Sequence, residues 1–447
     1  MSSSERKLPS SPVYDWLSPL RRFLQVQAAS GIVLLVCAIV ALGLANSPWA
    51  HAFASFWHMP VQIAIGSFRL SGTFGHLVVN DGLMTIFFFV VGLEIKRELV
   101  TGELNDPRKA LLPILAAVGG MVVPALVYLG LQWGEPGQQG WAIPMATDIA
   151  FVVGLLAMFG SRVPLGLKVF LLSLAIVDDL GAILIIAFVF SKSLMWGWLA
   201  VAAAGLAVTI LFNYIGVRLI AVYVIVGVVV WYAFLQSGIH PTVAGVLLGL
   251  LTPATAWVGN RTFAQLLEDL WEGEAQQEFL LAENPNKIKR LSSALQESDS
   301  PLHRLEVALH PWVAFIIMPT FALANAGVAL ELAALTQPVA LAVTAGLVIG
   351  KPVGILLACI IAIGLKVTSL PTGVTWTMLF SGACLAGIGF TMALFLNTLT
   401  FPVPEEATNE SAGKIGTLLG SLISAVLGAV LLLAATRKKT DEPQLAA

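Results

Sequence analysis

Two adjacent acidic residues, Asp178 and Asp179, interrupt a long apolar run, LSLAIVDDLGA at residues 172–182. Neighbouring positions of an α-helix point roughly 100° apart, so both carboxylates can line one cavity. Two like charges in a poorly solvated site repel each other, which favours binding of a proton or a cation. Carboxylate oxygens are also good ligands for small hard cations. Protons and a metal ion would therefore compete for the same oxygens, and this competition is the essential chemistry of a cation/proton exchanger.

Two other ionisable residues, Asp148 and Lys351, also lie inside apolar stretches. Such residues cost about 2.5–3.5 kcal/mol each at the centre of a membrane helix, so by default they mark function. Asp148 follows Pro144, which removes a helical hydrogen bond, and a second stretch is weakened by Gly387 and Gly389. Broken helices at corresponding positions in the two halves of a chain indicate a transport site.

The ends of broken helices carry partial charges that need partners. Asp148 is suited to the positive amino-terminal ends, and Lys351 to the negative carboxyl-terminal ends. Lys351 can alternatively pair with Asp178 or Asp179, and the sequence does not choose between these roles.

The composition identifies the class of protein that must position these residues. Apolar residues make up 57% of the 447 positions and charged residues 11%, against about 25% charged residues in soluble domains. A helix that crosses the membrane needs roughly 20 mostly apolar residues. We therefore predict an all-α membrane protein with twelve transmembrane helices, in windows at 28–46, 76–99, 111–131, 140–160, 166–190, 194–212, 219–236, 239–253, 305–326, 339–365, 375–396 and 413–435.

The positions of basic residues test this count, because cytoplasmic loops are enriched in Lys and Arg. With the amino terminus inside and twelve crossings, all but four of the 24 basic residues fall on the cytoplasmic side. The exceptions are Arg69, Lys192, Lys414 and the buried Lys351. We predict a multi-pass protein with a tail at 1–27, a membrane domain at 28–436 and a tail at 437–447, both tails being cytoplasmic. The first span is expected to be retained and not cleaved as a signal peptide.

The order of the spans predicts an inverted-topology repeat. Spans three to five and ten to twelve are an odd number of helices apart, so the second triplet runs opposite to the first. The broken helix is the middle one of each triplet, which makes two discontinuous helices in all.

Two connections are longer than ordinary loops. Residues 61–65 and 68–70 alternate loosely around Gly66-Ser67, which favours a small external β-hairpin within about 55–75 over an ordinary loop. The segment Ala254–His303 is a predicted cytoplasmic insertion, interpreted as a flexible linker with some amphipathic helix.

Several classes of partner are not expected. A net charge of -2 without a basic patch argues against nucleic acid. The cysteines at 37, 359 and 384 lie in apolar runs and are interpreted as small membrane-packed side chains. Membrane lipids and small cations are the expected partners, no cofactor is expected, and the protein is not expected to be an enzyme.

Weaker candidates have structural explanations of comparable weight. Asp81 and Glu94 lie toward opposite ends of the second span and form either interfacial charges or a gate. His240 opens the eighth span and is more typical of a hydrogen-bonded interface residue than of a sensor. Glu306 and His310 share one face of the ninth span, and two ligands are too few for a structural metal.

Five motifs together resemble the NhaA-type sodium/proton antiporters of bacterial inner membranes. The similarity extends over residues 25–435 apart from the insertion, and the motifs occur in the same order. They are Gly92-Leu-Glu-Ile-Lys-Arg-Glu98, Thr147-Asp148, Val177-Asp-Asp-Leu-Gly181, His310-Pro-Trp312 and Gly387-Ile-Gly-Phe-Thr-Met392.

The resemblance implies a role for each matching residue. Asp178 and Asp179 would bind Na⁺ or Li⁺ and the exchanged protons, with Asp179 more directly at the ion. Thr147 and Asp148 would lie at the helix crossing, with Lys351 near Asp178. A pH-responsive cytoplasmic cluster would comprise Glu94, Arg97, Glu98 and Glu306. Exchange would be electrogenic, would serve pH and sodium homeostasis, and the segment around Val61–Leu70 would join two protomers of a homodimer.

This sequence departs from the family's pattern at two places. Val307 stands where a histidine is expected after Glu306, which leaves the pH-responsive cluster in question. The Ala254–His303 insertion is longer than the family's short loop.

Two other classes compete with an antiporter. An intramembrane aspartyl protease would carry a tyrosine before its first aspartate, whereas Val177 precedes Asp178. A passive cation channel would need a filter built on a symmetry axis, and no filter-like loop is apparent. Selection of sodium among cations, and the order in which the two aspartates lose their protons, are not set by the residues themselves.

Overall fold

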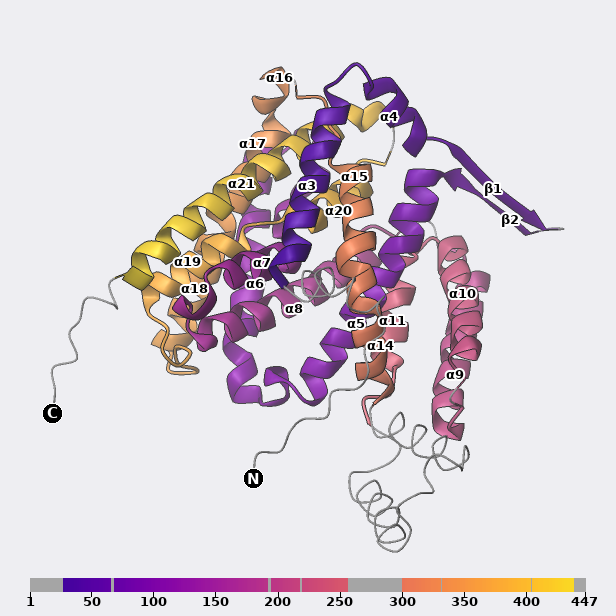
Figure 1. The fold of residues 1–447 in the computed structure, drawn as a ribbon, viewed down its shortest axis with the longest axis horizontal. Helices are drawn as coiled ribbons and strands as arrows, with labels where there is room; N and C mark the ends of the chain where they lie inside the picture. Colours follow the sequence, from indigo (N-terminus) through magenta and orange to yellow (C-terminus); the bar gives the residue numbers. More distant parts are fainter. Residues whose placement is uncertain are drawn as a thin grey trace, which may run out of the picture.

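The protein is built almost entirely from helices that pack side by side (Figure 1). The computed structural model describes residues 27–65, 68–191, 194–217, 219–255, 300–330, 332–402 and 404–437. The predicted tails and most of the 254–303 insertion lie outside these ranges.

The first part of the chain, up to residue 251, contains one β-hairpin, the helix that carries the aspartate pair and the helices on either side of it in the sequence. Its elements are α3 Gln27–Ala45, α4 Ala50–Trp57, β1 Pro60–Ile65, β2 Phe68–Thr73, η1 Phe74–Leu83, α5 Met84–Val100, η2 Glu103–Asn105, α6 Pro107–Gln132, η3 Gln138–Met145, α7 Ile149–Met158, η4 Gly160–Arg162, α8 Leu165–Phe188, α9 Trp196–Ile215, α10 Ile220–Ser237 and α11 Thr242–Leu251.

In the second half, every regular element among the described residues is a helix. Its elements are α14 Pro301–Trp312, η5 Val313–Ile317, α15 Met318–Asn325, α16 Leu332–Leu335, α17 Pro338–Ala345, η6 Gly346–Gly350, α18 Lys351–Gly364, α19 Trp376–Ala386, α20 Phe390–Thr400, η7 Pro404–Glu406 and α21 Ala407–Arg437.

Helix lengths only partly support the predicted membrane crossings. Within the described ranges, nine helices are long and apolar enough to cross a membrane, or up to eleven if each of two bent pairs is one span. Every predicted window contains helix, but the eighth holds only the ten-residue α11. Twelve crossings and an inverted repeat therefore remain predictions, while a multi-pass membrane protein is supported.

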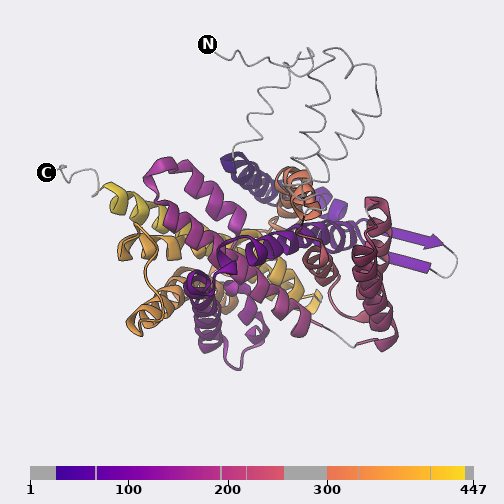
Figure 2. The same cartoon turned by 90° about the horizontal axis from the view of Figure 1, so that it is seen from below.

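The predicted β-hairpin is present. Strands β1 and β2 pair antiparallel from Pro60 opposite Thr73 to Ile65 opposite Phe68. The hairpin projects away from the helical body in both views, on the side where α9 and α10 lie (Figures 1 and 2).

The helix α8, which carries the aspartate pair, lies in the interior and contacts α5, α6, α7 and α19. By contrast, α9 packs on α10 and α11, and only Ala202 and Thr209 of its twenty residues are buried. An apolar helix with so much exposed surface is suited to contact lipid or another apolar surface.

Glycines bring the helices around the site into close contact. A Cβ at Gly119 of α6 would lie 2.3 Å from the Gly354 carbonyl oxygen of α18. Likewise, a Cβ at Gly92 of α5 would lie 2.6 Å from the Val246 carbonyl oxygen of α11. Small residues at helix contacts are typical of membrane proteins, because packing and not burial from water holds the helices together.

Two π-helical segments precede prolines, a feature that the sequence analysis did not anticipate. The segment η5 leads to Pro319 and η6 leads to Pro352, each proline being the second residue of the following α-helix. Proline has no N–H to donate to the preceding turn, and a local π-helical turn accommodates the lost bond. The turn in η6 ends immediately before Lys351.

Candidate functional site

The two predicted broken helices meet at their breaks. The first break, at Ala146–Asp148, separates η3 from α7, and the second, at Gly387–Gly389, separates α19 from α20 with a bend of 43°. The Asp148 N–H donates to the Ile388 carbonyl at 2.7 Å. The Thr147 hydroxyl donates to the Ala386 carbonyl at 2.9 Å. Backbone groups left unpaired by one break are thus satisfied by the other.

Asp148 caps both half-helices that begin at this crossing. Its Oδ1 accepts from the Phe151 N–H of α7 at 3.1 Å. Its Oδ2 accepts from the N–H of Thr391 in α20 at 3.1 Å and from the Thr391 hydroxyl at 2.5 Å. The carboxylate therefore lies at two positive helix ends, which agrees with the role inferred from sequence.

Lys351 fills both roles that its sequence position allows, as the partner of an aspartate and of a negative helix end. Its fully buried ammonium donates to Asp178 Oδ2 at 2.6 Å. It also donates to the carbonyl of Met145, the last residue of η3. One side chain therefore pairs with an aspartate and compensates a negative helix end at the same time.

The aspartate pair is buried and only partly paired. Asp178 and Asp179 are 1% and 3% exposed. Asp178 uses Oδ2 for Lys351, while its Oδ1 has no hydrogen-bond partner among the described residues. Thr147 lies beside this carboxylate, but its hydroxyl proton is directed to the Ala386 carbonyl.

Asp179 has still fewer partners than Asp178. No described group donates a hydrogen bond to its carboxylate, and it interacts electrostatically with Asp178, Glu94, Asp148 and Lys351. Carboxylates therefore outnumber the single ammonium around it. A buried carboxylate in such surroundings gains from binding either a proton or a cation.

The predicted pH-responsive residues form one charged cluster at the end of α5 and the start of α14. Arg97 pairs with Glu306, and its Nη2 lies 3.5 Å from Glu98 Oε1. Glu94, which interacts electrostatically with Arg97 and Glu306, also interacts with Asp179. The charge of Glu94 therefore interacts both with this cluster and with the aspartate pair.

Val307 does not join the cluster. Its side chain is 59% exposed, whereas the preceding Glu306 is buried. The position at which a histidine was expected is therefore mostly exposed in this protein, unlike the buried Glu306 beside it.

At the opposite end of the second predicted span, Asp81 lies close to two histidines, His76 and His240. Its carboxylate lies 3.1 Å from His76 Nδ1 and 3.5 Å from His240 Nε2. His240 Nδ1 is also 2.8 Å from the Thr242 hydroxyl. His240 is therefore hydrogen-bonded to Thr242 and lies within ion-pair distance of Asp81, while its place at a membrane interface stays a prediction.

Two partners at the crossing, Thr391 and the Met145 carbonyl, are not predictable from the sequence. Thr391 belongs to a motif that was recognised, yet its bond to Asp148 depends on how two distant breaks approach each other. The Met145 carbonyl is a backbone group and leaves no signal in the residue types. In the described part of the chain, no group of three or more His, Cys, Asp or Glu side chains is arranged to hold a resident metal.

Comparison with known proteins covers nearly the whole chain. The family model described as Na⁺/H⁺ antiporter 1 matches residues 21–432. A Na⁺/H⁺ antiporter NhaA of Rhodopirellula baltica is 51% identical over 97% of this chain and 98% of its own length. A Na⁺/H⁺ antiporter NhaA 2 of Sorangium cellulosum is 48% identical over 94% and 91%, and one of Acidiphilium cryptum is 46% identical over 96% and 95%. The chain therefore belongs to the Na⁺/H⁺ antiporter 1 family.

Proposed function

We propose that this protein exchanges Na⁺, or Li⁺, for protons across the bacterial inner membrane, with Asp178 and Asp179 as the shared binding site. The observation that carries the proposal is the incompletely paired aspartate pair, buried beside the crossing of two broken helices. The relatives are named for this exchange. It makes the protein a transporter, not an enzyme, with no cofactor besides the transported ions.

Competition for the same oxygens supplies the coupling. A cation at Asp179 and the free Oδ1 of Asp178 displaces protons from these carboxylates, and protons displace the cation in turn. Lys351 donates a hydrogen bond to the other oxygen of Asp178. A change in the charge of Asp178 therefore changes the electrostatic interaction with the ammonium directly. Met145 and Asp148 connect this event to both broken helices.

The number of carboxylates favours electrogenic exchange. Two carboxylates can accept two protons in one half of the cycle and one monovalent cation in the other. More protons than sodium ions would then move in each cycle, and the rate in proteoliposomes would respond to membrane potential. A rate that is insensitive to an imposed potential would contradict this stoichiometry.

Alternating access would use the crossing as its moving part. The two breaks are held by a few hydrogen bonds and not by continuous helix, which makes them suited to shift between two arrangements. The cluster of Glu94, Arg97, Glu98 and Glu306 would adjust this shift to cytoplasmic pH. Both termini would lie in the cytoplasm, as the distribution of basic residues predicts.

The test is exchange in inside-out membrane vesicles from a host without its own sodium/proton exchangers. Addition of Na⁺ to vesicles with an acidified lumen is expected to release protons and restore the fluorescence of a pH-sensitive dye. The Asp179→Asn variant should lose this signal, because one carboxylate no longer binds either ion. The matched control Glu135→Gln removes an exposed carboxylate from a loop and should behave as the parent.

Other outcomes separate the competing classes. Full exchange by Asp179→Asn would contradict the assigned site. Steady single-channel currents would favour a passive cation channel, and cleavage of a membrane-embedded reporter that requires Asp178 would favour a protease.

A further inference from the structure

The helix α20, the second half of one broken helix, begins without a capping side chain of its own. The first hydrogen bond within it runs from the Ala393 N–H to the Gly389 carbonyl at 2.9 Å, so the N–H groups of residues 390–392 need other acceptors. A Ser, Thr, Asp or Asn side chain just before a helix usually supplies one. The residue at that position is Gly389, which has no side chain to do so. The acceptors must therefore come from other parts of the fold.

Close packing at the crossing explains why a glycine precedes α20. A Cβ at Gly389 would lie 3.0 Å from the Ala146 carbonyl oxygen, which belongs to the other break. It would also lie 3.0 Å from the Leu347 side chain. A capping side chain at this position would push the two breaks apart, so the crossing itself excludes one.

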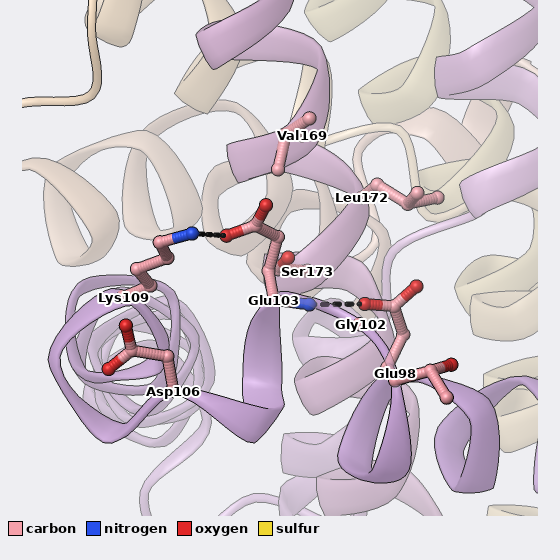
Figure 3. Close-up of a pocket in the computed structure, with 9 residues that line it drawn as sticks. Glu98, Gly102, Glu103, Asp106, Lys109, Val169, Leu172 and Ser173 are labelled. Carbon is pink, nitrogen blue, oxygen red and sulfur yellow. Dashed lines mark hydrogen bonds and ion pairs between the residues drawn. The ribbon is translucent and has the colours of Figure 1, made fainter.

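Ser421 of α21 supplies the acceptor for the first N–H of α20. The Phe390 N–H donates to the Ser421 hydroxyl oxygen at 3.0 Å, across 31 residues of sequence, and Ser421 is 6% exposed. Backbone N–H groups elsewhere find closer partners. That of Glu103, for example, donates to the carboxylate of Glu98, five residues earlier, at 3.2 Å (Figure 3). The bond from Phe390 to Ser421 is therefore a link between two helices and not a feature of one turn.

This bond reaches Asp148 through the next residue of α20. The Thr391 N–H and hydroxyl both donate to Asp148 Oδ2, and Phe390 directly precedes Thr391. Ser421 therefore fixes the part of α20 that contacts Asp148. A hydroxyl does this without adding another charge to an interior that already contains three aspartates and one lysine.

The helix α21 contacts both halves of this broken helix. A Cβ at Gly428 of α21 would lie 2.5 Å from the Leu385 side chain of α19, so the two helices approach closely there. Ser421, seven residues earlier, bonds to the start of α20. One continuous helix thus spans the break, and its position sets where α20 begins.

We propose that Ser421 is a positioning residue for the exchange, because its hydroxyl holds the start of α20 on α21 so that Thr391 meets Asp148. Its one hydrogen bond within the described part of the chain is to Phe390, so it acts on the site only through α20. Without the hydroxyl, fewer molecules would hold the crossing in its working arrangement, and those that do would bind the cation as before. This inference rests on the proposed exchange.

The first test is the rate of sodium-dependent proton release per molecule of protein, in inside-out vesicles at constant pH. Ser421→Ala should lower the maximal rate about two- to tenfold, the change that corresponds to one lost hydrogen bond, with the KM for Na⁺ close to that of the parent. Ser421→Thr keeps the hydroxyl and should keep most of the rate.

Ser424 provides the matched control. It lies about one turn further along α21 and is 1% exposed, yet its hydroxyl has no hydrogen-bond partner among the described residues. Ser424→Ala removes the same atom from the same helix and should exchange like the parent. An equal fall of the rate in Ser421→Ala and Ser424→Ala would show a general sensitivity of α21 and overturn the proposal.

A second measurement does not depend on transport. Hydrogen–deuterium exchange of the purified protein in detergent reports how well the peptide that contains Phe390 is protected. Ser421→Ala should speed exchange in this peptide and leave peptides of α8 unchanged. Either unchanged protection or an unchanged maximal rate in Ser421→Ala would overturn the proposal. So would a slow Ser421→Thr variant in which the peptide stays protected.

Failure of the exchange itself would look different. A parent without any sodium-dependent signal would contradict the proposed exchange, and the deuterium measurement would still show whether Ser421 holds the start of α20.

Discussion

At the scale of single residues, Lys351 decides how the aspartate pair is tolerated in the interior. Its ammonium is shared between Asp178 Oδ2 and the Met145 carbonyl. Asp179 receives no comparable partner within the described part of the chain. The two adjacent aspartates are therefore chemically different, and Asp179 is the carboxylate more available to an incoming ion.

Removal of Lys351 tests this pairing. Lys351→Ala should lower the thermal stability of the purified protein, because an unpaired buried charge costs about 3–5 kcal/mol. Adding Asp178→Asn to that variant should restore part of the loss, since the uncompensated charge is then gone. The measurement is the unfolding temperature in detergent of the parent, the two single variants and the double variant. Strictly additive effects of the two substitutions would contradict a direct pair.

At the scale of elements, the site depends on close contacts between helices. The helix α18 begins at Lys351 and packs on α6 through Gly354 and Gly119. The break of α19–α20 contacts that of η3–α7 through backbone bonds. Positions of the charged residues are therefore set by helix-to-helix distances as much as by the residues themselves.

A side chain at Gly119 should disturb the site without touching it. Gly119→Val places its Cβ 2.3 Å from the Gly354 carbonyl oxygen, which forces α18 and Lys351 away from α6. Exchange is expected to fall at least tenfold at a similar level of protein in the membrane. In the control Gly130→Val, also within α6, the added Cβ meets nothing within 4 Å. Equal activity of the two variants would show that this contact does not position Lys351.

At the scale of the whole molecule, one side presents the β-hairpin and the exposed helices α9 and α10 (Figure 2). An antiparallel pair of strands that projects from the body offers unpaired edges. A second copy of the chain can pair with such an edge, and we propose a homodimer that forms through this hairpin.

Shortening the hairpin tests that assembly. Replacement of residues 60–73 by a short flexible linker should convert a dimer into a monomer, measured by light scattering of the protein in detergent. Proton release on addition of Na⁺ should persist, because the hairpin shares no residue with the aspartate site. A dimer that persists after the hairpin is shortened would contradict dimer formation through the hairpin.

The sequence by itself determined the class of the protein and singled out four charged residues within its apolar runs. Charged residues are so costly in a membrane that Asp148, Asp178, Asp179 and Lys351 stand out from the apolar runs around them. Proline and glycine similarly indicated both helix breaks, and the alternation at residues 61–70 indicated the hairpin.

Only the tertiary structure decided which groups meet. The bond from Thr391 to Asp148 joins residues far apart in the chain, as does the bond from Lys351 to the Met145 carbonyl. Such contacts depend on how helices cross and on backbone groups that residue types do not encode.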